Sequence, residues 1–166
     1  MLRNLALASV LVVCIPAMAN AQGPAGKPFG LGLSAGEPAG VTAKYWFNRT
    51  NALDAAVGYG FFPHKGVAVF VDYLYHLHTL VPAGNVPFKL VFYLGVGGKL
   101  GVWNYDRKGE DDSGVGLGVR MPFGLTMIFV QAPFDVFLEI TPSVAFITPD
   151  PFYFDLDACL GGRFYF

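Results

Sequence analysis

The sequence predicts an all-β protein, an eight-stranded antiparallel up-and-down barrel, and three observations support this fold class. Apolar and small or polar residues alternate with a period of two in eight segments, as in strands whose successive side chains point to opposite faces. The chain also contains 21 Gly and 12 Pro, which punctuate these segments. No segment is followed by a helical pattern, so parallel βαβ units are not expected.

The first 21 residues have the features of a cleaved signal peptide. Arg3 precedes an apolar run from Leu5 to Ile15, and residues 19–21 match the A-x-A cleavage pattern. The apolar run is too short to anchor the chain as a membrane-spanning helix. We therefore expect an exported protein with a flexible leader at residues 22–28 and a single barrel domain at residues 29–166.

Eight strands follow from the alternation. We expect them at residues 29–36, 40–48, 52–61, 67–78, 88–103, 114–129, 134–146 and 152–166. Several reach the 9–11 residues that a tilted membrane strand needs. EPAG, NRTN, PHKG and TPDP are tight turns by composition, whereas TLVPAGNVP is longer and NYDRKGEDDS is the longest charged link. With both termini on the periplasmic side, the charged link faces outward as an exposed loop. Its charged residues are Asp106, Arg107, Lys108, Glu110, Asp111 and Asp112.

The composition indicates which face of each strand points inward. Of the 166 residues, 54% are hydrophobic and only 14% are charged, whereas a well-solvated surface carries roughly 25–35% charged residues. One face of the strands is aliphatic, with Tyr and Phe toward the strand ends, which suits lipid and its interfacial aromatic belts. The other face is rich in Gly and holds nearly balanced charges, which suits a packed interior. The predicted interior polar network is Lys44, Asp54, Asp72, Lys99, Arg120, Glu139, Asp157 and Arg163.

The chain also resembles a known class of proteins. Its last strand ends on Phe164 and Phe166 with apolar residues at alternate positions before them, which resembles the C-terminal assembly signal of bacterial outer-membrane β-barrels. The whole mature chain is similar to small eight-stranded barrels of the OmpA/OmpX type. GEPAGVTAKYWF, DYLYH, YLGVGGKL, GVRMPFGL and DVFLEI resemble a little-characterised family of small outer-membrane barrels.

The resemblance implies a porin-like fold in the outer membrane of a Gram-negative bacterium. Outer-membrane lipid, the barrel-assembly machinery and periplasmic chaperones would then be its partners. The resemblance supplies no activity and no catalytic residues. The formal net charge of −1 argues against a nucleic-acid partner, and we expect a monomer.

The residues offer little chemistry for an enzyme. Asp72, His76 and His78 share one strand face, but an interior ion pair and rim histidines explain them better than a metal site. Ser34 and Ser143 lack a G-x-S-x-G context. Once the signal is removed, Cys159 has no partner for a disulfide. We therefore predict no catalytic residues, no metal ligands and no cofactor.

The expected function is a structural, membrane-integrity or surface-interaction role. Eight strands enclose only enough room for side chains, so the lumen should be filled and at most a very narrow pore. Two alternatives stay open. One is a soluble, lipocalin-like barrel with its apolar face turned inward around an apolar ligand. The other is a barrel enzyme that acts on membrane lipid.

Overall fold

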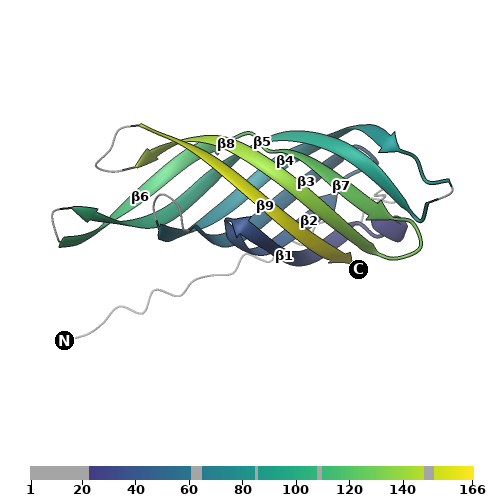
Figure 1. Ribbon diagram of the computed structural model, residues 1–166, viewed down its shortest axis with the longest axis horizontal. Helices are drawn as coiled ribbons and strands as arrows, with labels where there is room; N and C mark the ends of the chain where they lie inside the picture. The colour runs from purple at the N-terminus through teal and green to yellow at the C-terminus, as the bar shows by residue number, and fades with distance from the viewer. Residues whose placement is uncertain (1–22, 61–64, 85, 108–109, 148–151) are drawn as a thin grey trace.

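The protein is a closed, elongated β-barrel (Figure 1). The computed structural model describes residues 23–60, 65–84, 86–107, 110–147 and 152–166. A 3₁₀ turn, η1 (Pro24–Gly26), precedes the strands. The strands are β1 (Phe29–Glu37), β2 (Ala39–Trp46), β3 (Asn51–Gly60), β4 (Lys65–Val81), β5 (Phe88–Arg107), β6 (Glu110–Arg120), β7 (Phe123–Phe129), β8 (Phe134–Ile147) and β9 (Tyr153–Tyr165).

The strands form one antiparallel sheet that closes on itself. β1 to β5 pair in chain order, β5 pairs with both β6 and β7, and both of these pair with β8. β8 pairs with β9 and β9 pairs with β1, so the first and last strands lie side by side. In that seam Leu31 is opposite Phe164. This is the up-and-down topology that the alternation predicts. Pairing of the first strand with the last closes the sheet, so that among the described residues the body of the barrel has no open edge, as strands in hydrocarbon require.

Nine strand segments make eight passes, because β6 and β7 are two parts of one pass. The break falls at Met121 and Pro122, where proline has no N–H for the ladder. The two residues at the break nevertheless remain hydrogen-bonded to the neighbouring strands. Gly95 N donates to Pro122 O at 2.8 Å, and Met121 N donates to Pro142 O at 3.0 Å. β5 continues past the break and pairs with both segments. The expected strand at residues 114–129 is thus one pass with an interrupted ladder.

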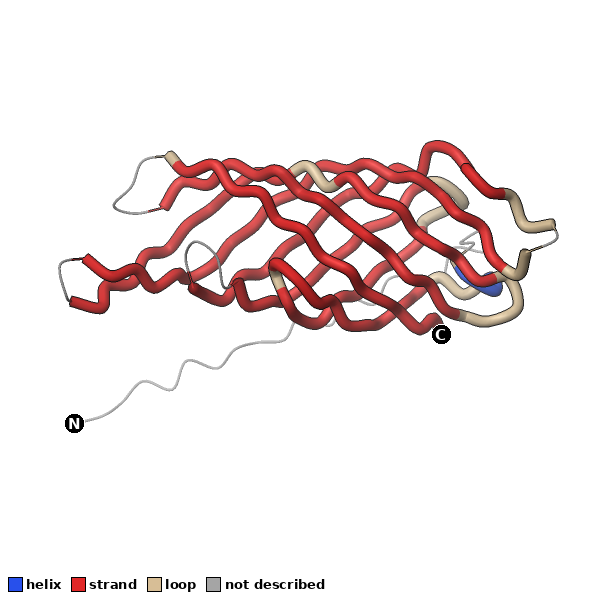
Figure 2. Tube along the Cα trace, in the orientation of Figure 1, coloured by secondary structure: helices blue, strands red, loops and turns tan. Residues whose placement is uncertain are grey.

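The barrel has two distinct ends (Figure 2). The terminal end carries η1, the C-terminal Phe166 and the turns that follow β2, β4 and β7. At the far end β1, β3, β5 and β8 end.

The exterior of the barrel is apolar. Leu33 and Leu117 are 67% and 63% exposed, and every pass of the barrel carries further aliphatic side chains that are exposed on the exterior. Pairs of aromatic rings lie on the exterior near both ends. The ring centres of Phe164 and Phe166 are 5.3 Å apart at the terminal end, and those of Phe146 and Phe152 are 5.7 Å apart at the far end. The soluble, lipocalin-like alternative is therefore wrong, because its apolar face would point inward. Within the described residues, no helix is long and apolar enough to cross a bilayer.

Two segments differ from the sequence-based expectation. The sequence predicts a flexible leader at residues 22–28, but from Gly23 onward the chain is packed at the terminal end, with Pro24 buried and Pro28 O accepting from Trp46 N at 2.9 Å. The sequence also predicts a long charged loop at residues 104–113. Instead β5 runs to Arg107 and β6 starts at Glu110, with Asp106 opposite Asp111, so most of that loop is a strand hairpin. Lys108 lies outside the described residues.

Candidate functional site

The polar residues of the barrel converge in its lumen. All eight predicted interior residues are buried, with 1% to 7% of their surface exposed. They come from every pass except the first, because the strand alternation turns the same face inward around the closed sheet. The structure groups them into ion-pair clusters at successive heights along the lumen.

The cluster nearest the terminal end is centred on Arg163 of β9. Its guanidinium forms an ion pair with Asp54 of β3 and lies 3.7 Å from Asp135 Oδ2 of β8. Its Nε donates to Thr42 Oγ1 at 3.1 Å, and that hydroxyl donates to Asp54 Oδ1 at 2.9 Å. Tyr165 OH donates to Asp135 Oδ2 at 2.6 Å. One cation thus neutralises carboxylates on two opposing walls.

The middle cluster is centred on Arg120 of β6. Its Nη2 donates to Glu139 Oε1 at 3.1 Å, and its Nε lies 3.3 Å from Asp72 Oδ1. Glu139 accepts further hydrogen bonds from Tyr93 OH at 2.8 Å and Thr141 Oγ1 at 2.9 Å. These contacts satisfy a buried carboxylate from three strands, as a charge in a packed interior requires.

The far-end cluster has fewer contacts and is more exposed to solvent than the other two. Lys99 Nζ lies 2.7 Å from Asp155 Oδ2 and 3.8 Å from Asp157 Oδ2. The Asp155 side chain is 14% exposed, whereas the Asp135 side chain in the first cluster has no exposed surface.

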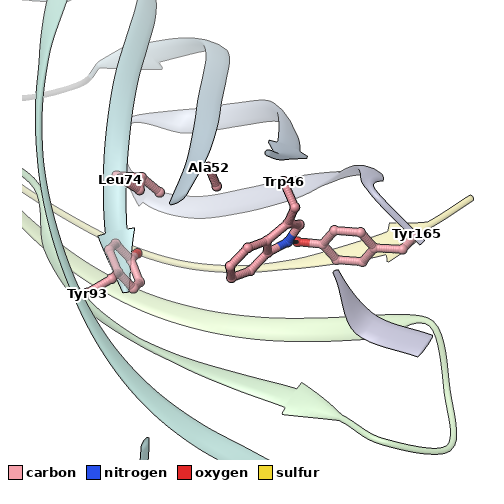
Figure 3. Packing of buried hydrophobic residues seen from close by; sticks show 5 residues of the cluster. All are labelled: Trp46, Ala52, Leu74, Tyr93 and Tyr165. Atoms are coloured by element: carbon pink, nitrogen blue, oxygen red, sulfur yellow. Dashed lines mark hydrogen bonds between the residues drawn. The ribbon is translucent and has the colours of Figure 1, made fainter. Parts of the chain in front are cut away.

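Lys44, the last of the eight residues, belongs to an aromatic layer near the terminal end. Its Nζ donates to His76 Nε2 at 2.9 Å and lies 4.6 Å from the Trp46 ring centre. His76 Nδ1 lies 3.1 Å from Thr50 O, so a ring with its proton on Nδ1 satisfies both contacts. Figure 3 shows Trp46 and Tyr165 pointing toward each other, and Trp46 Nε1 donates to Tyr165 OH at 3.3 Å.

Both arginines stack on phenylalanine rings inside the lumen. The Arg163 guanidinium lies 3.8 Å from the Phe137 ring centre, and that of Arg120 lies 4.4 Å from the Phe70 ring centre. A cavity of about 30 Å³ separates the two stacks, which is room for a water molecule rather than a solute.

Interior glycines make space for the aromatic rings. A Cβ on Gly161 would lie 2.3 Å from the Phe137 ring, and one on Gly124 would lie 2.3 Å from Cζ of Tyr93. The glycines of the polar face are therefore sites of close approach between neighbouring strands and rings.

The eight residues of the predicted network do not include every member that the structure shows. Alternation also places Asp135 and Asp155 on the interior face, and the structure adds them to the Arg163 and Lys99 clusters. The hydroxyl groups of Thr42, Tyr93, Thr141 and Tyr165 have the same phase. Only the structure shows that they donate to the buried carboxylates.

β4 carries Asp72, His76 and His78, and its register changes between the two histidines. A β-bulge between His76 and His78 shifts the register, so that His76 is opposite Tyr93 and His78 is opposite Phe92. The two histidines therefore do not occupy equivalent positions of the ladder, and Asp72 pairs with Arg120. No group of three or more potential metal ligands occurs among the described residues.

The remaining predicted residues lie at the two ends. Phe164 and Phe166 lie on the exterior at the terminal end, where Phe166 N donates to Phe29 O at 2.8 Å. Of the charged-loop residues, Asp106, Arg107, Glu110, Asp111 and Asp112 belong to the β5–β6 hairpin at the far end.

A family model described as "Protein of unknown function (DUF3996)" matches residues 25–151, which is more than half of the chain. The chain belongs to this family. Within the match lie the interior residues from Lys44 to Glu139, whereas Asp157 and Arg163 of the closing strand β9 lie beyond it. No curated protein matches the chain.

Two solved structures share the fold. The N-terminal β-barrel domain of Pseudomonas aeruginosa OprF matches with a TM-score of 0.62 and 14% identity, over 84% of this chain and 98% of that one. Neisserial surface protein A (NspA) matches with a TM-score of 0.52 and 15% identity, over 83% of this chain and 93% of that one. The all-β closed barrel expected from the sequence is confirmed by these matches.

Proposed function

We propose that this protein is an integral β-barrel of the outer membrane of a Gram-negative bacterium, exported through a cleaved signal peptide, with a structural role in membrane integrity. The observation that carries the proposal is the inverted distribution of polarity. Charged side chains are paired inside the barrel, while the exterior between the ends is aliphatic.

The exterior supports a lipid environment. Contiguous exposed apolar surfaces on soluble monomers rarely exceed a few hundred Å². Here outward-facing Leu, Val and Ile side chains cover all eight passes, and aromatic contacts lie at both ends. In a bilayer these side chains face hydrocarbon, and the aromatic rings lie at the two interfaces.

The interior supports a filled lumen with no more than a very narrow pore. The Arg120 and Arg163 clusters cross the lumen between opposing walls, and Trp46, Tyr93 and Tyr165 are buried between them and the terminal end. The proposal assigns no catalytic role, because the carboxylates that could act as acids or bases, such as Asp72 and Glu139, are paired with Arg120.

The two ends of the barrel would have different roles, one in assembly and the other in surface contacts. The exterior Phe164 and Phe166 would be recognised by the barrel-assembly machinery after delivery by periplasmic chaperones. The far end, with its charged β5–β6 hairpin, would face the cell exterior and provide any surface interaction. The barrel would act as a monomer in contact with outer-membrane lipid.

The test is gel mobility in SDS of the protein in isolated outer membranes, with and without boiling. A closed membrane barrel resists SDS unboiled and changes mobility on heating. Two matched variants locate the lipid face: Val71→Arg in mid-barrel and Val130→Arg in the turn after β7. Arg costs about 2–4 kcal/mol at the midplane but about 0–1 kcal/mol near an interface. We expect Val71→Arg to lose the heat-shifted form and Val130→Arg to keep it.

Two outcomes would contradict the proposal. One is recovery of the protein in the soluble periplasmic fraction without a heat shift. The other is equal tolerance of Val71→Arg and Val130→Arg in membrane-assembled protein.

A further inference from the structure

A cavity of about 790 Å³ lies at the terminal end of the barrel. Its walls are η1, the turn after β2, the β4–β5 hairpin and the last residues of β7. Figure 2 shows η1 at this end, beside the ends of the strands. The volume is within the range of about 300–1,000 Å³ that is typical of pockets for small ligands.

The polar lining of this cavity is cationic. Arg49 lines it from the turn after β2 and Lys89 from the start of β5, and Thr50, Thr79 and His76 also belong to the lining. Among the described residues, no Asp or Glu lines the cavity. A third cation lies behind the lining, since Lys44 Nζ is 2.9 Å from His76 Nε2. Such one-signed charge in a concave site favours an anion.

The rest of the lining is apolar. The buried Trp46 and Val91 belong to the lining, and so does an apolar strip of three consecutive residues, Ile128, Phe129 and Val130, at the end of β7 and in the turn after it. An inorganic ion would contact only the cationic side and leave this strip unused. The lining therefore matches a ligand with two parts, one charged and one apolar.

We propose that this cavity is a binding site for a small organic anion, a carboxylate or phosphate monoester that carries an apolar group. The anionic group lies between Arg49 and Lys89, and the apolar group lies against Trp46 and Ile128. The inference does not depend on the membrane role proposed above, since it concerns one end of the folded barrel.

Trp46 provides a reporter in the lining itself. It packs against the N-terminal segment, where a Cβ on Gly23 would lie 2.8 Å from Trp46 Cδ1, and its ring centre is 4.2 Å from that of His76. Trp46 and Trp103 are the two tryptophans of the chain. A Trp103→Phe background therefore isolates the fluorescence of Trp46.

The experiment titrates phenyl phosphate into the purified, folded barrel in a zwitterionic detergent, with Trp46 emission as the readout. Inorganic phosphate and benzyl alcohol are the two half-ligand controls. We expect a saturable change with phenyl phosphate and at least tenfold weaker responses to either control. The affinity should fall as salt is raised, because the contact is partly electrostatic.

Charge-reversal variants test the location. Lys89→Glu and Arg49→Glu should each weaken phenyl phosphate binding at least tenfold. Lys27→Glu is the matched control, because Lys27 lies at the same end but over the exterior Phe164 ring, 5.9 Å from its centre, and does not line the cavity. We expect less than a twofold change for this control.

Three results would overturn the inference: no saturable response, equal binding of benzyl alcohol, or equal weakening by Lys27→Glu. Each variant is first checked for heat-shifted mobility in SDS. A loss of fold or of membrane assembly is thereby separated from a loss of binding.

Discussion

Arg163 and Asp54 form an ion pair across the lumen, although 109 residues separate them in the chain. They lie on β9 and β3, and the Arg163 side chain is 1% exposed. The pair joins the closing strand to the wall formed by the first strands.

Replacing Arg163 with Met should destabilise the barrel by about 3–5 kcal/mol, because Asp54 and Asp135 would stay buried without their cation. The measurement is the free energy of unfolding from urea titration of the protein in phospholipid vesicles. Arg163→Lys is the control and should lose less, since it keeps the charge. A loss below about 1 kcal/mol for Arg163→Met would show that the pair contributes little.

Lys99→Met should cost less than Arg163→Met, about 1–3 kcal/mol. Its partner Asp155 has a side chain that is 14% exposed and can keep part of its hydration. The same urea titration ranks the two variants. An equal or larger loss for Lys99→Met would contradict the difference in hydration between the clusters.

Gly124→Ala should destabilise the barrel by about 1–3 kcal/mol through overpacking. The new Cβ would lie 2.4 Å from Oη of Tyr93, so the ring must move and its hydrogen bond to Glu139 is lost. Gly98→Ala is the matched control, because its Cβ would meet only Gly118 O at 3.5 Å. Thermal unfolding in detergent compares them, and equal midpoints would refute the close approach.

Removing the two stacked rings with Phe70→Ala and Phe137→Ala should open the lumen around the small cavity between the arginines. We expect little or no steady conductance for the unaltered protein in planar bilayers and a clear increase for the double variant. Val69→Ala with Leu138→Ala changes exterior positions on the same two strands and should leave the conductance unchanged. An unchanged double variant would mean that other side chains seal the lumen.

Phe166→Ala should reduce assembly into the outer membrane of cells and leave the stability of the refolded protein nearly unchanged. The Phe166 ring is 60% exposed, and its backbone hydrogen bond to Phe29 O is kept in the variant. Phe154→Ala, an exterior aromatic of the same strand toward the far end, is the control. The measurement is the heat-shifted fraction in isolated membranes, and equal effects of the two changes would argue against a terminal assembly signal.

The alternation predicts much of this architecture because a strand has only two faces. Once the polar face is placed inside, Lys44, Asp72 and Arg163 must all point into the lumen. The partners cannot be derived in this way. Which residue of β3 lies opposite Arg163 across the lumen depends on the stagger of eight paired strands, and period-two alternation carries no information about that stagger.

Local departures from the expected strands have local causes. Pro122 removes one ladder donor without disturbing the alternation, so the sequence predicts one strand where the structure has β6 and β7. The bulge after His76 inserts a residue and changes the phase of β4. The charged residues near Asp106 suggest a solvated loop by composition, but charged residues at the end of a hairpin are compatible with strand pairing.

The seam between β1 and β9 has a consequence for the order of events during biogenesis. Arg163 is on β9, the strand that closes the sheet against β1, whereas its carboxylate partners are on β3 and β8. Until the last strand arrives, Asp54 and Asp135 lack this counter-charge, and an open sheet would bring them uncompensated into lipid. Neutralisation and closure thus coincide, and a chain truncated before β9 should be barred from the bilayer by its own unbalanced charge.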